Sequence, residues 1–264
     1  MFYWIYDIST ESLALLCAGV FVGVSVLGCL FVRPLLCILV PSRPHTNDVV
    51  GYVLSSFCVF YGILLGLLAV AAYQNFSQVE LNVTNESSSL AALYYDVSAY
   101  PDPERGELRQ LLRVYCRYVI DEAWPLQRKG IIPKGGIEKV VAFQQRLAQY
   151  EPKTKAQEII HAETLREFNK FVELRRLRLH SVTTGIPAVM WYVVIVGALI
   201  NIALVWLFEL NFMPRVFLGA ILAFFLGTMV CLIAAMDNPF RGEVSVSPEA
   251  FELVIELMDA QEKP

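Results

Sequence analysis

The sequence predicts an all-α integral membrane protein with four transmembrane helices in two hairpins and a helical soluble insert. Four apolar stretches contain no Asp, Glu, Lys or Arg, although 17% of the 264 residues are charged. Each reaches the roughly 20 residues that a helix needs to cross the bilayer core. Backbone exposed to lipid must satisfy its own hydrogen bonds, which favours helices. The stretches are Leu13–Val32, Val49–Tyr73, Ile186–Phe208 and Val216–Met236.

The connections between these spans predict how the chain is divided. Short links join the first two spans and the last two spans, so each pair is expected to form an antiparallel hairpin. A long polar segment separates the two pairs. We expect a first hairpin over residues 1–75, a helical soluble insert over 76–184, a second hairpin over 185–236 and a tail with an amphipathic helix over 237–264.

The apolar spacing inside the insert predicts helices throughout. The helix of the second span is expected to continue until Pro101 and Pro103 break it. A second helix is expected to end at Trp124 and Pro125, and a third to follow a glycine-rich turn. After Pro152, a last helix is expected to run unbroken into the third span.

The tail contains signals for the start of one more helix. Ser247 is predicted as the N-cap, with Pro248 at the first helical position and Glu249 in the first turn. An apolar stripe follows at helical spacing, made of Phe251, Val254, Ile255 and Met258. We expect this stripe to pack on the insert or on a neighbouring subunit.

Composition argues against several classes of function. A net charge of −4 does not indicate a nucleic-acid-binding protein, so no nucleic-acid partner is expected. The three histidines are scattered, and no span contains a histidine or a carboxylate for intramembrane catalysis. No metal-binding spacing or phosphate-binding loop occurs. We therefore expect no metal site, no cofactor and no enzymatic activity.

Charge near the span ends predicts a multi-pass protein of the cell membrane, with the insert and both termini in the cytoplasm. The basic run Arg175–Arg178 lies just before the third span, and positively charged flanks favour the cytoplasmic side. Three glycosylation-type triplets would suit the reverse orientation. They begin at Asn75, Asn82 and Asn85.

The second span concentrates small, hydroxyl and aromatic residues without any charge. Uncharged spans leave a single subunit without a polar route, so a conduction path has to lie on a symmetry axis between subunits. Rings of apolar side chains on one helical face would form a constriction there. The candidates for this neck are Phe57, Phe60, Tyr61 and Leu64.

The start of the second span has two possible interpretations. In the first, His45, Asn47 and Asp48 form an ion-attracting pore mouth, because histidine titrates near neutrality. In the second, Thr46, Asn47 or Asp48 is a helix N-cap that satisfies free backbone amides. Small residues in the spans allow close helix packing. The packing candidates are Gly19, Gly23, Gly62, Gly66, Gly219 and Gly227.

Together these features resemble the bestrophin-like family of bacterial membrane proteins and, more distantly, the bestrophin anion channels. The matching stretches are His45–Gly51, Tyr61–Phe76 and Asn238–Phe251. The resemblance implies a homo-oligomer, pentameric if the likeness is literal, whose second span faces a central pore. It places an apolar neck near the four neck candidates.

The same resemblance raises the question of calcium. Bestrophins follow a Pro-Phe-Gly sequence with an acidic run that binds calcium, whereas this chain has Arg241 after Pro239-Phe240 and then a single acid, Glu243. Calcium takes six to eight oxygen ligands, which one glutamate does not supply. Calcium gating is therefore not expected here.

Two functions follow from these observations. The first is an oligomeric anion channel with the second span lining a central pore; its partners are copies of itself, the lipid bilayer and the permeating anion. The alternative is a membrane-anchored helical sensor or scaffold whose insert binds a ligand or a partner protein. An oligomeric assembly is required by the first function and not by the second.

Overall fold

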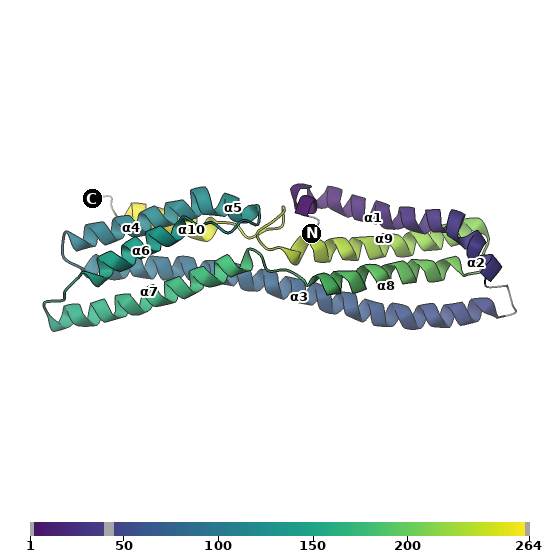
Figure 1. Cartoon of the computed structure of the whole chain (residues 1–264), viewed down its shortest axis with the longest axis horizontal. Coiled ribbons are helices and arrows are strands. Elements are labelled where there is room, and N and C mark those ends of the chain that lie inside the picture. The colour runs from purple at the N-terminus through teal and green to yellow at the C-terminus, as the bar shows by residue number, and fades with distance from the viewer. Residues whose placement is uncertain (1–2, 40–44, 262–264) are drawn as a thin grey trace. The chain divides into compact units, whose positions relative to one another are not determined.

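The predicted fold class is confirmed. A computed structural model describes residues 3–39 and 45–261, and within them the chain forms helices and no strands (Figure 1). Four of the described helices are long and apolar enough to cross a membrane. They are Thr10–Leu36, Thr46–Ala99, Ala188–Trp206 and Phe212–Asp237.

The chain divides into two compact units. The first unit combines Met1–Gln74 with Gly185–Asp237 and Gly242–Val244. The second unit combines Asn75–Thr184 with Asn238–Arg241 and Ser245–Pro264. The long helix α3 contributes its first part to the first unit and the rest to the second.

The first unit contains the spanning helices. Helix α1 (Thr10–Leu27) and helix α8 (Ala188–Trp206) both pack against α9 (Phe212–Asp237), as Figure 1 shows. A π-helical segment, Gly28–Val32, leads from α1 into α2 (Arg33–Leu39). The core of this unit is apolar and includes Tyr61, Leu65, Val194, Ile202, Leu226 and Ile233.

The second unit is a bundle of helices around an aromatic and aliphatic core. Its helices are the later part of α3 (Thr46–Asp96), α4 (Glu104–Tyr118), α6 (Gly136–Ala148), α7 (Lys155–Ser181) and α10 (Glu249–Ala260). The α3 helix continues past its apolar stretch as predicted. Core residues that are almost fully buried include Leu90, Leu93, Tyr94, Leu108, Leu147 and Phe251.

Trp124 and Pro125 do not end a helix, contrary to the prediction. A π-helical segment, Val119–Ala123, follows α4, and α5 (Trp124–Arg128) continues from it. The Trp124 amide donates to the carbonyl of Val119, five residues back. Pro125 falls in the first turn of α5, where a missing N–H is tolerated.

The expected unbroken helix into the third span is also wrong. Helix α7 ends at Ser181, and α8 begins at Ala188 directly after Pro187. Proline disfavours helical geometry in the residue before it, so α8 does not extend back through Ile186.

The tail helix starts one residue later than predicted, with Pro248 at the N-cap position and no side-chain cap. Its apolar stripe nevertheless packs on the second unit, as expected. Phe251, Val254 and Met258 are buried, and α10 packs against α4. The Cys116 thiol contacts the Phe251 carbonyl oxygen at 3.4 Å. Burial raises the pKa of this thiol to about 12.

A buried ion pair joins three helices of the second unit. The Arg178 guanidinium on α7 donates to Glu86 on α3, with Nε–Oε2 at 2.6 Å and Nη2–Oε1 at 3.0 Å. The Tyr115 hydroxyl on α4 donates to the same carboxylate at 2.8 Å. Burial and the Glu86 charge raise the pKa of Tyr115, which therefore stays neutral. In the sequence alone, Arg178 is one of the basic residues that indicate membrane orientation, and nothing there reveals its buried partner.

A second polar contact in this unit involves a histidine. The Tyr100 hydroxyl and His161 Nδ1 lie 2.8 Å apart, and the Tyr150 ring packs beside both side chains. Partial burial lowers the pKa of His161 from its ordinary value of 6.5. The folded protein therefore favours the neutral imidazole.

Glu86→Gln should destabilise the second unit by about 3–5 kcal/mol, because it leaves the Arg178 guanidinium buried without a counter-charge. The double variant Glu86→Leu/Arg178→Met should lose less stability than Glu86→Leu and Arg178→Met lose in sum when each is made alone. Thermal unfolding of the purified protein measures both. Lys170→Met, which breaks the ion pair between exposed Lys170 and half-buried Glu167, is the control and should cost less than about 1 kcal/mol. Equal losses of stability for Glu86→Gln and Lys170→Met would show that the buried pair matters no more to stability than the Lys170–Glu167 pair.

His161 should make stability depend on pH. Its pKa is lower in the folded state than in the unfolded chain, so the unfolded chain binds the proton more tightly. Its contribution to stability is complete above pH 6.5 and is lost as the pH falls from there through the folded pKa. Thermal unfolding at a series of pH values should show a smaller loss for His161→Phe than for the wild type. Parallel pH curves for the two proteins would rule this out.

Candidate functional site

The four neck candidates lie on α3 but differ in exposure. Phe60 is 75% exposed, whereas Phe57 and Leu64 are half-buried. Tyr61 is 5% exposed, and its hydroxyl donates to the Val194 carbonyl of α8 at 2.7 Å. Tyr61 therefore holds α3 against α8 inside the first unit.

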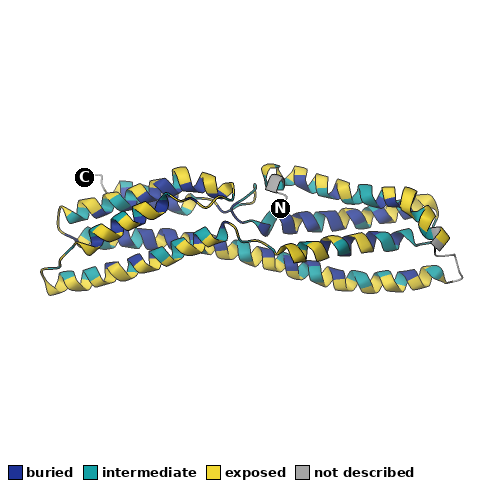
Figure 2. Ribbon diagram, viewed as in Figure 1, coloured by how far each residue is buried: buried dark blue, intermediate teal, exposed yellow. Residues whose placement is uncertain are grey.

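Phe60 belongs to a stripe of exposed apolar residues on α3. Ile63 is 57% exposed and Leu67 is 66% exposed, and both follow Phe60 at steps of three and four residues. We call Phe60, Ile63 and Leu67 the α3 outer stripe. Exposed positions recur along this part of α3 in Figure 2. Sequence reasoning concentrated on aromatic side chains and missed Ile63 and Leu67, although the three-and-four step from Phe60 leads to them.

The residues proposed for a pore mouth lie at the start of α3 in two different settings. His45 Nδ1 and Asp48 Oδ2 are 3.2 Å apart, and both side chains are exposed. Asn47 Oδ1 accepts a hydrogen bond from the Glu209 amide at 2.7 Å. Asn47 thereby ties α3 to the link between α8 and α9, while His45 and Asp48 face solvent.

At the other end of the spans, Asp237 joins α8 and α9. Its Oδ1 accepts from the Ile186 amide at 2.5 Å, and its Oδ2 accepts from Trp191 Nε1 at 3.2 Å. Asp237 is buried, and both carboxylate oxygens have partners. The carboxylate therefore fixes the entry of the chain into α8.

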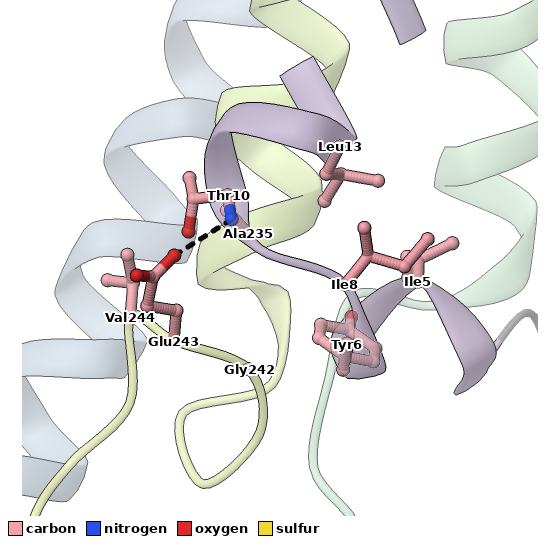
Figure 3. Close-up of a pocket in the computed structure, with 9 residues that line it drawn as sticks. All are labelled: Ile5, Tyr6, Ile8, Thr10, Leu13, Ala235, Gly242, Glu243 and Val244. Atoms are coloured by element: carbon pink, nitrogen blue, oxygen red, sulfur yellow. Dashed lines mark hydrogen bonds between the residues drawn. The ribbon is translucent and has the colours of Figure 1, made fainter. Parts of the chain in front are cut away.

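Glu243 stabilises the beginning of α1. Its Oε2 accepts from the Thr10 amide at 2.9 Å, as Figure 3 shows. This hydrogen bond lowers the pKa of Glu243, so the carboxylate stays charged. A small hollow beside it is lined mainly by apolar side chains, among them Tyr6, Ile8 and Leu13 (Figure 3). Within residues 3–39 and 45–261, no three His, Cys, Asp or Glu side chains gather where a metal ion would bind.

The packing glycines fall into two groups. A side-chain carbon at Gly227 would lie 2.9 Å from the Ala18 Cα, and one at Gly219 would lie 2.7 Å from Ser25 Oγ. These two glycines permit close contact between α9 and α1. The others face open space within the chain: Gly19, Gly23, Gly62 and Gly66.

Two close-packing glycines were missed by sequence reasoning. A side chain at Gly28 would overlap the Trp206 ring, and one at Gly197 would overlap the Tyr61 ring. Each glycine partners an aromatic ring far away in the sequence. No small-residue motif within one helix reveals such a pair.

A comparison with protein families settles the relationship. The Bestrophin-like domain model matches residues 19–251, which is most of the chain. The chain belongs to the Bestrophin-like domain family. The predicted resemblance is thus confirmed, and with it the assignment to membrane proteins of the ion-channel kind and not to enzymes. No curated protein sequence matches the chain.

Solved structures share the fold at low sequence identity. A mutant bacterial Bestrophin homolog from Klebsiella pneumoniae matches with a TM-score of 0.66 at 11% identity, covering 94% of this chain and 99% of that one. Another structure of a Klebsiella pneumoniae homolog has a TM-score of 0.66 at 12% identity, with 93% and 98% covered. A structure described as a membrane protein has a TM-score of 0.69 at 10% identity, with 95% and 99% covered. At these identities the likeness establishes the fold alone.

Gly227→Ala should destabilise the first unit by about 1–3 kcal/mol, because the added carbon would lie within 3.0 Å of the α1 backbone and the two helices would have to shift apart. Gly19→Ala is the matched control. A side chain at Gly19 meets nothing within 4 Å, so this change should not destabilise the protein and should gain up to about 1 kcal/mol of helix propensity. Thermal unfolding in detergent compares the two. Identical melting curves for the two variants would argue against the close contact.

Proposed function

We propose that the protein is an oligomeric, anion-conducting channel in which α3 lines a central pore. The α3 outer stripe carries this proposal, because it is an exposed apolar face on a helix that has no charge between Asp48 and Glu80. Family membership agrees with the channel class. An exposed apolar face is also compatible with contact to lipid alone, so the proposal depends on whether the protein forms an oligomer.

The chemistry of the first unit supports the proposed oligomer. The core of this unit is apolar, and hydrogen bonds within it, such as that from Tyr61 to Val194, connect neutral groups. The buried charged side chains Arg215 and Asp237 lie at the two ends of α9. An ion crossing one subunit would therefore lose its hydration without replacement. Gly62 and Gly66 on α3 face open space within the chain, which leaves room for a neighbouring copy. A closed ring of copies, pentameric if the family likeness is literal, provides a shared axis.

Exposure refines the position of the proposed neck. Phe60, Ile63 and Leu67 point away from the other helices of the first unit, so they are the side chains that meet their copies around an axis. Phe57 and Leu64 are half-buried and flank this face. Rings of large apolar side chains gate a pore by excluding water when it is narrow.

The preference for anions rests on two supports. The chain resembles a family related to bestrophin anion channels, and its second span has no acidic side chain that would attract cations. At the mouth, His45 and Asp48 carry opposite charges when the histidine is protonated, so they give little net preference.

We place the second unit and both termini in the cytoplasm. Arg175 and Arg176 lie near the start of α8, and such positive flanks favour the cytoplasmic side. Arg178 is weaker evidence for this orientation, because its charge is buried and paired with Glu86. The three asparagine triplets all begin inside the continuous helix α3, whereas glycosylation acceptors lie in surface loops. The triplets therefore give little support to the reverse orientation.

A sensor or scaffold remains the second candidate, and one observation favours it. Ile131, Ile132 and Ile137, which precede or begin α6, are exposed on the second unit. Exposed apolar groups of this kind mark interaction surfaces. The scaffold needs no ring of subunits, so the mass of the particle in mild detergent discriminates the two functions. A monomer would exclude the pore.

Phe60→Ala should raise the single-channel conductance of the purified protein in planar bilayers, because it removes the largest side chain of the outer stripe. Phe224→Ala is the control, since Phe224 is an exposed aromatic residue on α9 that the proposal leaves in lipid. Conductance should change at least about twofold for Phe60→Ala and stay at the wild-type value for Phe224→Ala. Equal conductance in all three proteins would remove Phe60 from the pore. Absence of current from folded wild-type protein would remove the channel itself.

A further inference from the structure

One face of α3 in the second unit carries amide side chains. Gln78 and Asn85 are exposed and lie seven residues apart, which is about two helical turns. We call Gln78 and Asn85 the amide face. It is polar and carries no formal charge.

The charged residues of α3 lie elsewhere. The helix has no Lys or Arg, and its acids are Asp48, Glu80, Glu86 and Asp96. The Glu86 carboxylate is buried and paired with Arg178. Glu80 is exposed, but two residues along a helix are a rotation of about 200°, which places it away from Gln78. No fixed charge therefore competes with the amides on their own face.

The amides retain free hydrogen-bonding capacity. Gln78 Nε2 donates to Asn82 Oδ1 at 3.0 Å, which uses one of its two N–H groups. For the second N–H and the carbonyl oxygen of Gln78, the described residues offer no partner. The side-chain carboxamide of Asn85 likewise has no hydrogen-bond partner within the described part of the chain. A carboxamide presents both a donor and an acceptor, so it can solvate an ion of either sign.

We infer that the amide face lines the ion pathway and that Gln78 is a residue that determines charge selectivity. This inference rests on the proposed function, because the amides form rings only where α3 surrounds an axis. Neutral dipoles replace part of the hydration shell of a passing ion and discriminate weakly between charges. A formal charge introduced on this face is repeated in every subunit, so it dominates the selectivity of the pathway.

The test measures the K⁺/Cl⁻ permeability ratio from reversal potentials of the full-length protein in planar bilayers under a KCl gradient. Gln78→Glu should raise the ratio about tenfold, and Gln78→Lys should lower it by a similar factor. Glu80→Gln is the matched control, since it changes the charge by the same +1 as Gln78→Lys, only two residues away on another side of the helix. Its ratio should equal that of the wild type.

The outcomes separate this inference from the channel proposal. Opposite shifts for the two Gln78 variants, with Glu80→Gln unchanged, support the assignment. Currents with unaltered ratios, or an equal shift for Glu80→Gln and Gln78→Lys, overturn it while leaving the channel intact. No current from folded wild-type protein overturns both. If Gln78→Lys fails to fold, Asn85→Asp on the same face replaces it as the test. It should raise the K⁺/Cl⁻ permeability ratio, and an unchanged ratio would overturn the assignment.

Discussion

The absence of charge along the apolar stretches of the spanning helices is the constraint on which the rest of this structure depends. Lipid offers no partner for a charge or for a free backbone amide, so these stretches are helices with neutral side chains. Along them, helix association relies on close packing and on neutral hydrogen bonds. Gly227 lets α9 reach the α1 backbone, and the Tyr61 hydroxyl bonds to the Val194 carbonyl. A unit built in this way has no internal route for an ion.

The second unit is held together by different chemistry because its surroundings are different. The ion pair of Glu86 and Arg178, with the Tyr115 hydroxyl, connects three helices through a pair of opposite charges. Such a pair gives little net stability over an apolar core of the same volume, yet each partner is costly to leave alone. Its geometry therefore enforces one arrangement of α3, α4 and α7. Helix α3 passes through both kinds of environment.

Features that depend on residues close together in the sequence were predictable, whereas features that depend on residues far apart were not. The spans were predictable, because an apolar run of this length without a charge is typical of membrane helices. The continuation of α3 was predictable too, because its apolar spacing persists. The Glu86–Arg178 pair was not, since its members are 92 positions apart and either one alone looks like a surface charge. The helix end predicted at Pro125 was wrong because a π-helical segment changes the hydrogen-bond register before it. The unbroken helix predicted into the third span was wrong although Pro187 is a local signal against helix in the residue before it.

The candidate pore face was only partly predictable because it depends on the rotation of α3 about its axis. Helical spacing groups Phe57, Phe60, Tyr61 and Leu64 but does not say which of them face outward. The structure supplies the answer through Gly197, whose missing side chain admits the Tyr61 ring against α8. Adjacent residues differ by about 100° in direction, so seating Tyr61 inward turns Phe60 away from the unit. One tyrosine and one glycine, far apart in sequence, therefore decide which side chains are available to face a neighbouring copy.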